Sequence, residues 1–182
     1  MHNGFITVNE EKMSKSLGNF FLVRDILDKF PGDVVRFYLL STHYRSPIDF
    51  DDAKLSATAK GLERIKSAVA ALDETLEGLQ DFAAEKPEDN SEATALAEAI
   101  EKAYKDFETA MDDDFNTALA CAALFDFCKA VNTYLNAITT GCKPDKTALI
   151  RAREVFQSLA GDVLGILFKA KGKDSVHEWS VS

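Results

Sequence analysis

The spacing of apolar residues after Asp52 most constrains what this chain can fold into. Between residues 52 and 80 the apolar side chains recur at intervals of three and four, after one interval of seven: Leu55, Leu62, Ile65, Val69, Leu72, Leu76 and Leu79. Intervals of three and four place side chains along one narrow stripe of an α-helix. We therefore predict one long helix over residues 52–80.

Three further segments show the same period and predict three more helices, each after a good N-capping residue. A polar loop that contains Pro87 precedes the first of these segments, and a loop that contains Pro144 precedes the last. Long helices joined by short loops pack antiparallel, so we predict an antiparallel four-helix bundle over residues 52–170. The three segments are 92–111 (capped by Asn90 or Ser91), 117–140 (capped by Asp114 or Asn116 and ended by Gly141) and 146–166 (capped by Asp145, with Val163 on its apolar stripe).

The first fifty residues differ in character. Residues 5–8 are aromatic and β-branched, which predicts a buried strand. Two short helices are predicted over 21–30 and 34–42, and the alternation of Ile48 and Phe50 after Pro47 indicates an extended segment. The fold class is thus mainly α, with a small α/β part. This part is too small to bury a core alone, so we expect it to pack on the helices.

Charge and composition restrict the function classes. Basic and acidic residues balance over 1–50, so the whole net charge of −9 lies in 51–182. An acidic surface repels nucleic acid on average, so such a contact is expected only from the N-terminal part or from one basic stripe. The sequence lacks an eighteen-residue apolar stretch and a signal-peptide pattern, which predicts a cytoplasmic protein without a membrane partner.

The cysteines indicate packing rather than chemistry. Cys121, Cys128 and Cys142 are odd in number and show no C-x-x-C spacing, so neither a disulfide framework nor a zinc site is indicated. Cys121 and Cys128 lie seven residues apart, which predicts that both are buried on one helix face.

The string Lys12-Met13-Ser14-Lys15-Ser16 is the strongest chemical signal. Two ammonium groups on a loop can neutralise the charge that develops on a triphosphate as its α-phosphorus is attacked, and serine hydroxyls can add hydrogen bonds. This chemistry suits a reaction that forms an adenylate and releases pyrophosphate. The alternative is a surface turn that happens to be rich in lysine and serine.

The string is identified as the KMSKS signature of class I aminoacyl-tRNA synthetases, and three segments resemble the cysteinyl-tRNA synthetase family in particular. They are residues 4–21 around the signature, 35–48 (VRFYLLSTHYRSPI) and 110–117 (AMDDDFNT). The resemblance extends over most of residues 1–168. It implies that residues 1–20 end a catalytic domain, 21–51 form a stem-contact segment, 52–170 form a helical bundle of the tRNA-binding type, and 171–182 are a polar tail.

The resemblance also implies roles for single residues. Lys15 and Lys12 would be catalytic and would bind ATP together with Ser14 and Ser16. Lys15 would stabilise the transition state for cysteinyl-adenylate formation. The partners would be ATP, cysteine and tRNA(Cys). The HIGH-type motif and the zinc ligands of the family's catalytic domain do not occur in this sequence, so zinc is expected only outside it, and these residues alone are expected to be inactive.

Two other groups of residues allow alternative interpretations. Tyr44 and Arg45 follow His43 on a non-helical segment and would contact the tRNA backbone, or else pack the joint between the two parts. The triplet 112–114 lacks the alternating ligands and the glycine of a calcium loop, so it indicates a helix junction rather than a metal site.

Two other functions also stay open. The chain would be a non-catalytic helical module that binds tRNA or protein, or part of the related ligase that joins cysteine to an amino sugar in mycothiol synthesis. That ligase shares the signature loop and a similar His-Tyr-Arg string. The SLGNFF string after the loop and the MDDDFNT string resemble the tRNA synthetase more closely.

Overall fold

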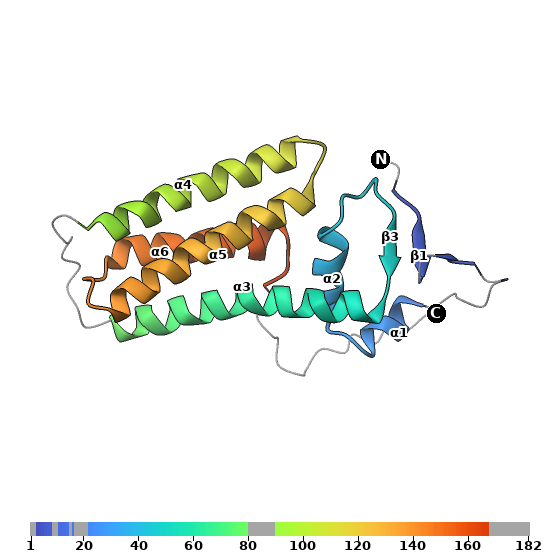
Figure 1. Cartoon of the computed structure of the whole chain (residues 1–182), viewed down its shortest axis with the longest axis horizontal. Coiled ribbons are helices and arrows are strands. Elements are labelled where there is room, and N and C mark those ends of the chain that lie inside the picture. Colours follow the sequence, from blue (N-terminus) through green and yellow to red (C-terminus); the bar gives the residue numbers. More distant parts are fainter. Residues whose placement is uncertain (1–2, 9–10, 15, 17–21, 80–89, 168–182) are drawn as a thin grey trace, which may run out of the picture.

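The computed structural model describes residues 3–8, 11–14, 16, 22–79 and 90–167 (Figure 1). The described part is mainly helical, as predicted, and contains one three-stranded sheet. The predicted polar tail, residues 171–182, lies outside the described residues. The sheet and two short helices lie at one end of four longer helices (Figure 1).

The sheet joins segments that are distant in the sequence. Strand β1 (Ile6–Val8) pairs antiparallel with β2 (Glu11–Lys12) and parallel with β3 (Ile48–Phe50). Helices α1 (Val23–Leu27) and α2 (Gly32–Leu40) lie between β1 and β3 in the sequence. The predicted strand and extended segment are confirmed. The predicted burial of the first strand is wrong for Phe5, which is 72% exposed, because the described residues do not cover this end of the sheet.

The longer helices begin at residues whose side chains accept a backbone N–H, which satisfies donors that a helix leaves unpaired. They are α3 (Asp52–Gly78, capped by Asp51), α4 (Ser91–Asp112, capped by Asn90), α5 (Thr117–Thr139, capped by Asn116) and α6 (Lys146–Val155, capped by Asp145). The predicted caps Asn90, Asn116 and Asp145 are confirmed. Gly141 follows α5 with a φ of +108°, which glycine adopts readily.

These four helices share one apolar core. Helix α5 packs against α3 and α4, and α6 also packs against both. Helix α5 is long and apolar enough to cross a membrane by length and composition. Its position explains this composition, because Leu124, Val131 and Tyr134 are buried in the core. Cys121 and Cys128 are buried on the same helix, as predicted.

The chain after α6 departs from the prediction of one continuous helix. Helix α6 ends at Val155 and continues as a π-helical segment, η1 (Phe156–Val163), after which the Leu164 N–H donates to the Leu159 carbonyl at 3.0 Å. The wider π turn shifts the buried positions by one residue. Val163, predicted on the apolar stripe, is therefore 50% exposed, and Leu164 is buried in its place.

Helix α2 connects the two parts because it is buried on two faces. Val34 and Phe37 belong to the large core of the four helices. Val35 and Tyr38 instead belong to a small cluster that also contains Phe50 of β3, together with Ile26 and Leu55. The expectation that the N-terminal part packs on the helices is confirmed.

Replacing the Phe37 side chain tests whether α2 depends on the large core. Phe37 is buried and its ring meets Phe125 edge-on at 6.0 Å between centroids. We expect Phe37→Ala to lower the free energy of unfolding in urea by about 3–5 kcal/mol, because it leaves a cavity. The control Leu39→Ala, on the exposed side of the same helix, should cost less than about 1 kcal/mol. Equal losses in the two variants would contradict this account.

Candidate functional site

The β1–β2 hairpin positions the start of the signature loop. Thr7 pairs with Lys12, and the Met13 N–H donates to the Ile6 carbonyl at 3.5 Å. Lys12 lies on β2 with an exposed side chain, and its ammonium nitrogen is 5.7 Å from the centroid of the Phe5 ring. The hairpin therefore holds Lys12 at the surface, where an anion can approach it.

A hydrogen bond between two serines shapes the next residues. The Ser14 and Ser16 hydroxyl oxygens are 2.9 Å apart, so the two side chains lie on the same side of the chain. Lys15 itself and residues 17–21 lie outside the described residues. The structure thus places Lys12 at the end of β2, with the hydrogen-bonded Ser14 and Ser16 following shortly after it in the chain. The role of Lys15 stays a prediction.

Tyr44 and Arg45 lie on the loop between α2 and β3, and both contact Asp114 at the turn between α4 and α5. The Arg45 Nε lies 2.5 Å from Asp114 Oδ2, and the Arg45 Nη2 donates to Oδ1 at 3.2 Å. The Tyr44 hydroxyl donates to Oδ1 at 2.7 Å. The His43 ring stacks on Tyr44 at 4.9 Å between centroids. These contacts join the N-terminal part to the helices.

The contacts among Tyr44, Arg45 and Asp114 stabilise the charged forms of Asp114 and Arg45. The hydrogen bonds from Arg45 and then Tyr44 lower the pKa of the Asp114 carboxyl. The same hydrogen bonds to Asp114 raise the pKa of Tyr44 and of Arg45. Asp114 is therefore a carboxylate, and Arg45 a cation, over the whole physiological range. Asp114 does not cap α5, since Asn116 does so.

Gly4 links this loop to strand β1. Its N–H donates to the Tyr44 carbonyl at 2.7 Å. A Cβ atom at Gly4 would lie 2.1 Å from the Ser46 carbonyl oxygen, so only glycine allows this approach. Three residues after Gly4, the Thr7 hydroxyl donates to the Asp49 carboxylate at 2.7 Å, and Lys54 pairs with the same carboxylate at 2.6 Å.

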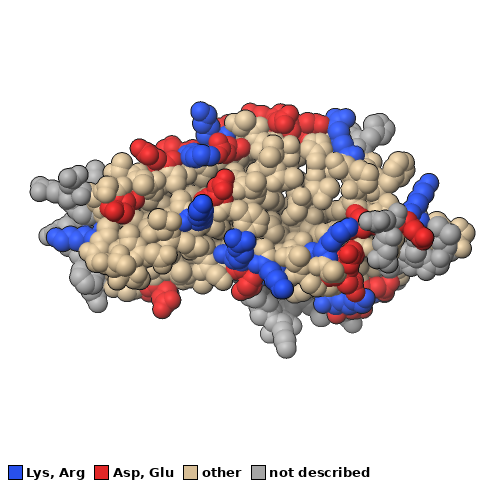
Figure 2. Space-filling view, viewed as in Figure 1, with Lys and Arg blue, Asp and Glu red and all other residues tan. Residues whose placement is uncertain are grey.

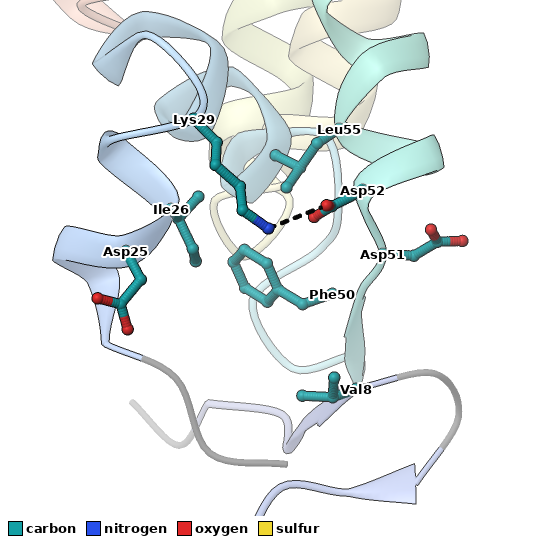
Figure 3. Close-up of a pocket in the computed structure, with 8 residues that line it drawn as sticks. All are labelled: Val8, Asp25, Ile26, Lys29, Phe50, Asp51, Asp52 and Leu55. Carbon is teal, nitrogen blue, oxygen red and sulfur yellow. Dashed lines mark hydrogen bonds and ion pairs between the residues drawn. The ribbon is translucent and has the colours of Figure 1, made fainter.

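A cleft of about 330 Å³ lies between β1, α1 and the start of α3 (Figure 3). Its apolar lining comes from Val8, Ile26, Phe50 and Leu55. Lys29 reaches across it to Asp52, and the two charged atoms are 3.2 Å apart (Figure 3). With Asp25 and Asp51 also at the cleft, carboxylates outnumber the lysine, which does not favour a polyphosphate there.

The described surface also bears on nucleic-acid and metal binding. Acidic residues outnumber basic ones along α4, and Figure 2 shows Asp and Glu gathered along this edge. Within the described ranges, the His, Cys, Asp and Glu side chains form no group of three or more that could hold a metal ion. Burial raises the pKa of the Cys121 and Cys128 thiols to about 12, so both are unreactive.

The sequence analysis missed two residues of this region. Asp114 was considered only as a helix cap or as part of a metal site, and Gly4 only as part of the signature string. A local signal existed for Asp114, because the acidic triplet 112–114 ends two residues before the capping Asn116 and contains more carboxylates than a cap needs. Its partner Arg45 could not be identified, since the two lie 69 residues apart in the sequence.

Comparisons with known proteins match both parts of the chain. The family model described as the class I (C) tRNA synthetase catalytic domain matches residues 1–60. The family model described as the DALR domain matches residues 106–169. The first match contains the hairpin, the signature loop and the Tyr44–Arg45 loop, and the second contains Asp114.

The chain is also similar to curated proteins named cysteine–tRNA ligase. It is 54% identical to that of Heliobacterium modesticaldum over 91% of this chain and 34% of the relative. The identity is 51% for Desulforamulus reducens, over 94% of this chain and 34% of the relative. The identity is 52% for Moorella thermoacetica, over 94% of this chain and 35% of the relative. The chain thus spans about a third of the length of these relatives.

One solved structure shows a similar fold. It is the ternary complex of Agrobacterium radiobacter K84 agnB2 LeuRS with tRNA and LeuAMS. The likeness has a TM-score of 0.67 at 26% identity and covers 90% of this chain and 20% of that chain.

The close approach at Gly4 makes a local prediction. We expect Gly4→Ala to destabilise the chain by about 1–3 kcal/mol in urea unfolding, because the new methyl group overlaps the Ser46 carbonyl. Amide hydrogen exchange in β1 should also become faster. The control Gly78→Ala places its methyl group in open space at the end of α3, so it should be neutral or slightly stabilising. Unchanged exchange in β1 of Gly4→Ala would rule out the overlap.

Proposed function

We propose that this chain, which spans about a third of the length of its cysteine–tRNA ligase relatives, is part of such a ligase, and that the whole ligase activates cysteine with ATP and transfers it to tRNA(Cys). The observation that carries this proposal is the signature string on a hairpin, within a chain about half identical to these ligases over nine tenths of its length. The ligase is then an ATP-dependent enzyme of protein synthesis, and this role assigns it to the cytoplasm.

The proposed chemistry of the signature loop follows from its charge. A carboxylate oxygen of cysteine attacks the α-phosphorus of ATP. A new oxygen–phosphorus bond forms, and the bond between the α-phosphorus and the bridging oxygen breaks, so that pyrophosphate leaves. Negative charge develops on the phosphate oxygens, where Lys15 and Lys12 stabilise it. Ser14 and Ser16 hold the loop through their mutual hydrogen bond and can donate to a phosphate oxygen.

The proposed domain division follows the same family. Residues 1–20 end the catalytic domain, 21–51 form the stem-contact segment, 52–170 form an antiparallel four-helix bundle of the tRNA-binding type, and 171–182 form a tail. The packing of α3, α4, α5 and α6 around one core supports the bundle. The position of α2 in both clusters supports a stem-contact segment that is built onto the bundle rather than separate from it.

Exposed apolar residues support the proposal that the site needs further residues of the ligase. Phe5, Leu22 and Val23 are more than half exposed, all near the hairpin and α1. Strands β1 and β3 pair in parallel, and parallel sheets are normally covered on both faces. We infer that the other half of the ATP site, with its HIGH-type motif and any zinc ligands, covers this region.

Tyr44 and Arg45 are proposed to have two roles. Their contacts with Asp114 support a joint between the two parts. The Arg45 side chain is nevertheless 61% exposed, so a phosphate of the tRNA backbone can still approach its guanidinium group. The LeuRS neighbour is a complex with tRNA, which supports tRNA as the partner of this fold.

Pyrophosphate exchange tests whether the site is incomplete. We expect the purified 182 residues to show no cysteine-dependent exchange between ATP and pyrophosphate, because Lys12 and Lys15 lack an opposing ATP site. A ligase extended to the length of the relatives should show it and should also charge tRNA(Cys). Exchange by the 182 residues would contradict the incomplete site. Exchange without tRNA charging would favour the amino-sugar ligase, and neither activity in the extended protein would favour a non-catalytic module.

Lys15→Ala in the extended ligase tests the loop itself. We expect the rate of cysteine-dependent exchange to fall by about 10²–10³-fold with little change in the KM for cysteine, because the lost charge acts on the transition state. The control Lys60→Ala, on the exposed side of α3, should keep the normal rate. An unchanged rate in Lys15→Ala would remove the role proposed for this lysine.

A further inference from the structure

Asp114 belongs to the helical part but is the common partner of two residues from the N-terminal part. Its Oδ1 accepts from the Tyr44 hydroxyl at 2.7 Å and from Arg45 Nη2 at 3.2 Å, and its Oδ2 lies 2.5 Å from Arg45 Nε. The Arg45 Nε is also 3.0 Å from the Tyr44 hydroxyl oxygen. A carboxylate held by both edges in this way restricts the orientation of its partners, which a single contact would not.

The backbone holds the Asp114 carboxylate in place. Asp114 and Phe115 have φ angles of +54° and +52°, in the left-handed region that aspartate and asparagine tolerate best among residues with a side chain. The Phe115 N–H donates to the Met111 carbonyl and the Asn116 N–H to the Ala110 carbonyl, each at 3.0 Å. The turn between α4 and α5 thus directs the carboxylate towards Arg45 through two unusual backbone conformations.

Hydrogen bonds and short stretches of chain connect this carboxylate with the signature loop. The loop of Tyr44 and Arg45 is closed by the Ser46 N–H, which donates to the His43 carbonyl at 2.8 Å. The Tyr44 carbonyl then accepts from the Gly4 N–H at 2.7 Å. Strand β1 begins two residues after Gly4, at Ile6, and pairs with β2, which carries Lys12. Two hydrogen bonds, one strand pair and short stretches of chain thus connect the Asp114 carboxylate with Lys12.

Global stability does not explain this arrangement. Arg45 and Asp114 are both substantially exposed, and exposed ion pairs contribute little to stability. The large core already holds the helices and α2 together without them. The contact instead joins the loop that leads into β3 to the turn between α4 and α5.

We propose that Asp114 is a positioning residue, which holds Tyr44 and Arg45 and thereby sets the orientation of β1 and of the Lys12–Ser16 loop on the helices. The inference rests on the proposed function, because the catalytic role of that loop comes from it. The residue acts through other groups and does not itself touch ATP.

Asp114→Asn is the sharpest test, because asparagine keeps the left-handed backbone and removes the charge. In the 182-residue chain we expect amide exchange at residues 4–8 to become about tenfold faster, as the hold on the Tyr44 loop weakens. Exchange within α3 and α5 should stay the same. The control Asp113→Asn, next in the sequence and not in contact with Arg45, should change neither.

A double variant separates the Arg45 contact from other effects. Arg45→Gln should speed exchange at residues 4–8 in the same way, and Asp114→Asn combined with Arg45→Gln should add little further, because both changes break one contact. Full additivity of the two changes would overturn the proposal. So would unchanged exchange in Asp114→Asn, or an equal increase throughout α3 and α5, which would show a general effect on stability.

Kinetics of the extended ligase complete the test. Asp114→Asn should lower the kcat of cysteine-dependent pyrophosphate exchange by about tenfold with an unchanged KM for cysteine, and Asp113→Asn should not. A normal kcat for pyrophosphate exchange, together with faster amide hydrogen exchange at residues 4–8, would overturn the positioning role and leave the proposed function intact. An unaltered extended ligase without activity would overturn the proposed function, whereas the amide exchange of the 182-residue chain would still report on Asp114.

Discussion

The burial of α2 on two faces is the constraint on which the rest of the structure depends. Phe37 and Val34 fill the core of the four helices, and Val35 and Tyr38 pack under the sheet, so rotation of α2 would expose one set or the other. Polar contacts hold the same orientation. Asp33 pairs with Lys66 of α3 at 2.6 Å, and Arg36 donates to the Leu164 carbonyl at 2.6 Å after η1. The sheet and the helices therefore form one packed unit.

The helices could be predicted closely because burial and capping both leave local signals. Intervals of three and four located α3, α4 and α5, and Asn90, Asn116 and Asp145 marked helix starts. The π-helical segment could not be predicted in this way. Val163 and Leu164 are adjacent and both apolar, so the pattern does not tell which is buried, and the change in hydrogen bonding that decides it leaves no side-chain signal.

The candidate site was predictable only as far as its residues are close in the sequence. The KMSKS string indicated phosphate chemistry, and the structure places Lys12 at the end of β2 and brings the Ser14 and Ser16 hydroxyls together after it. The sequence left open whether Tyr44 and Arg45 contact tRNA or pack the joint between the two parts. Their contacts with Asp114 support the joint, and the exposure of Arg45 leaves a tRNA contact possible. That partner, Asp114, lies at the turn between α4 and α5, and such long-range pairing depends on packing that a local pattern does not contain.

The parallel pairing of β1 with β3 has a consequence for the order of folding. Thr7 and Asp49 lie 42 residues apart, so their contact closes a long loop that contains α1 and α2. Closing such a loop costs chain entropy before the strand pair contributes anything, whereas neighbouring helices form through local contacts. We therefore expect the pairing of β1 with β3 to form after the helices and to open before them.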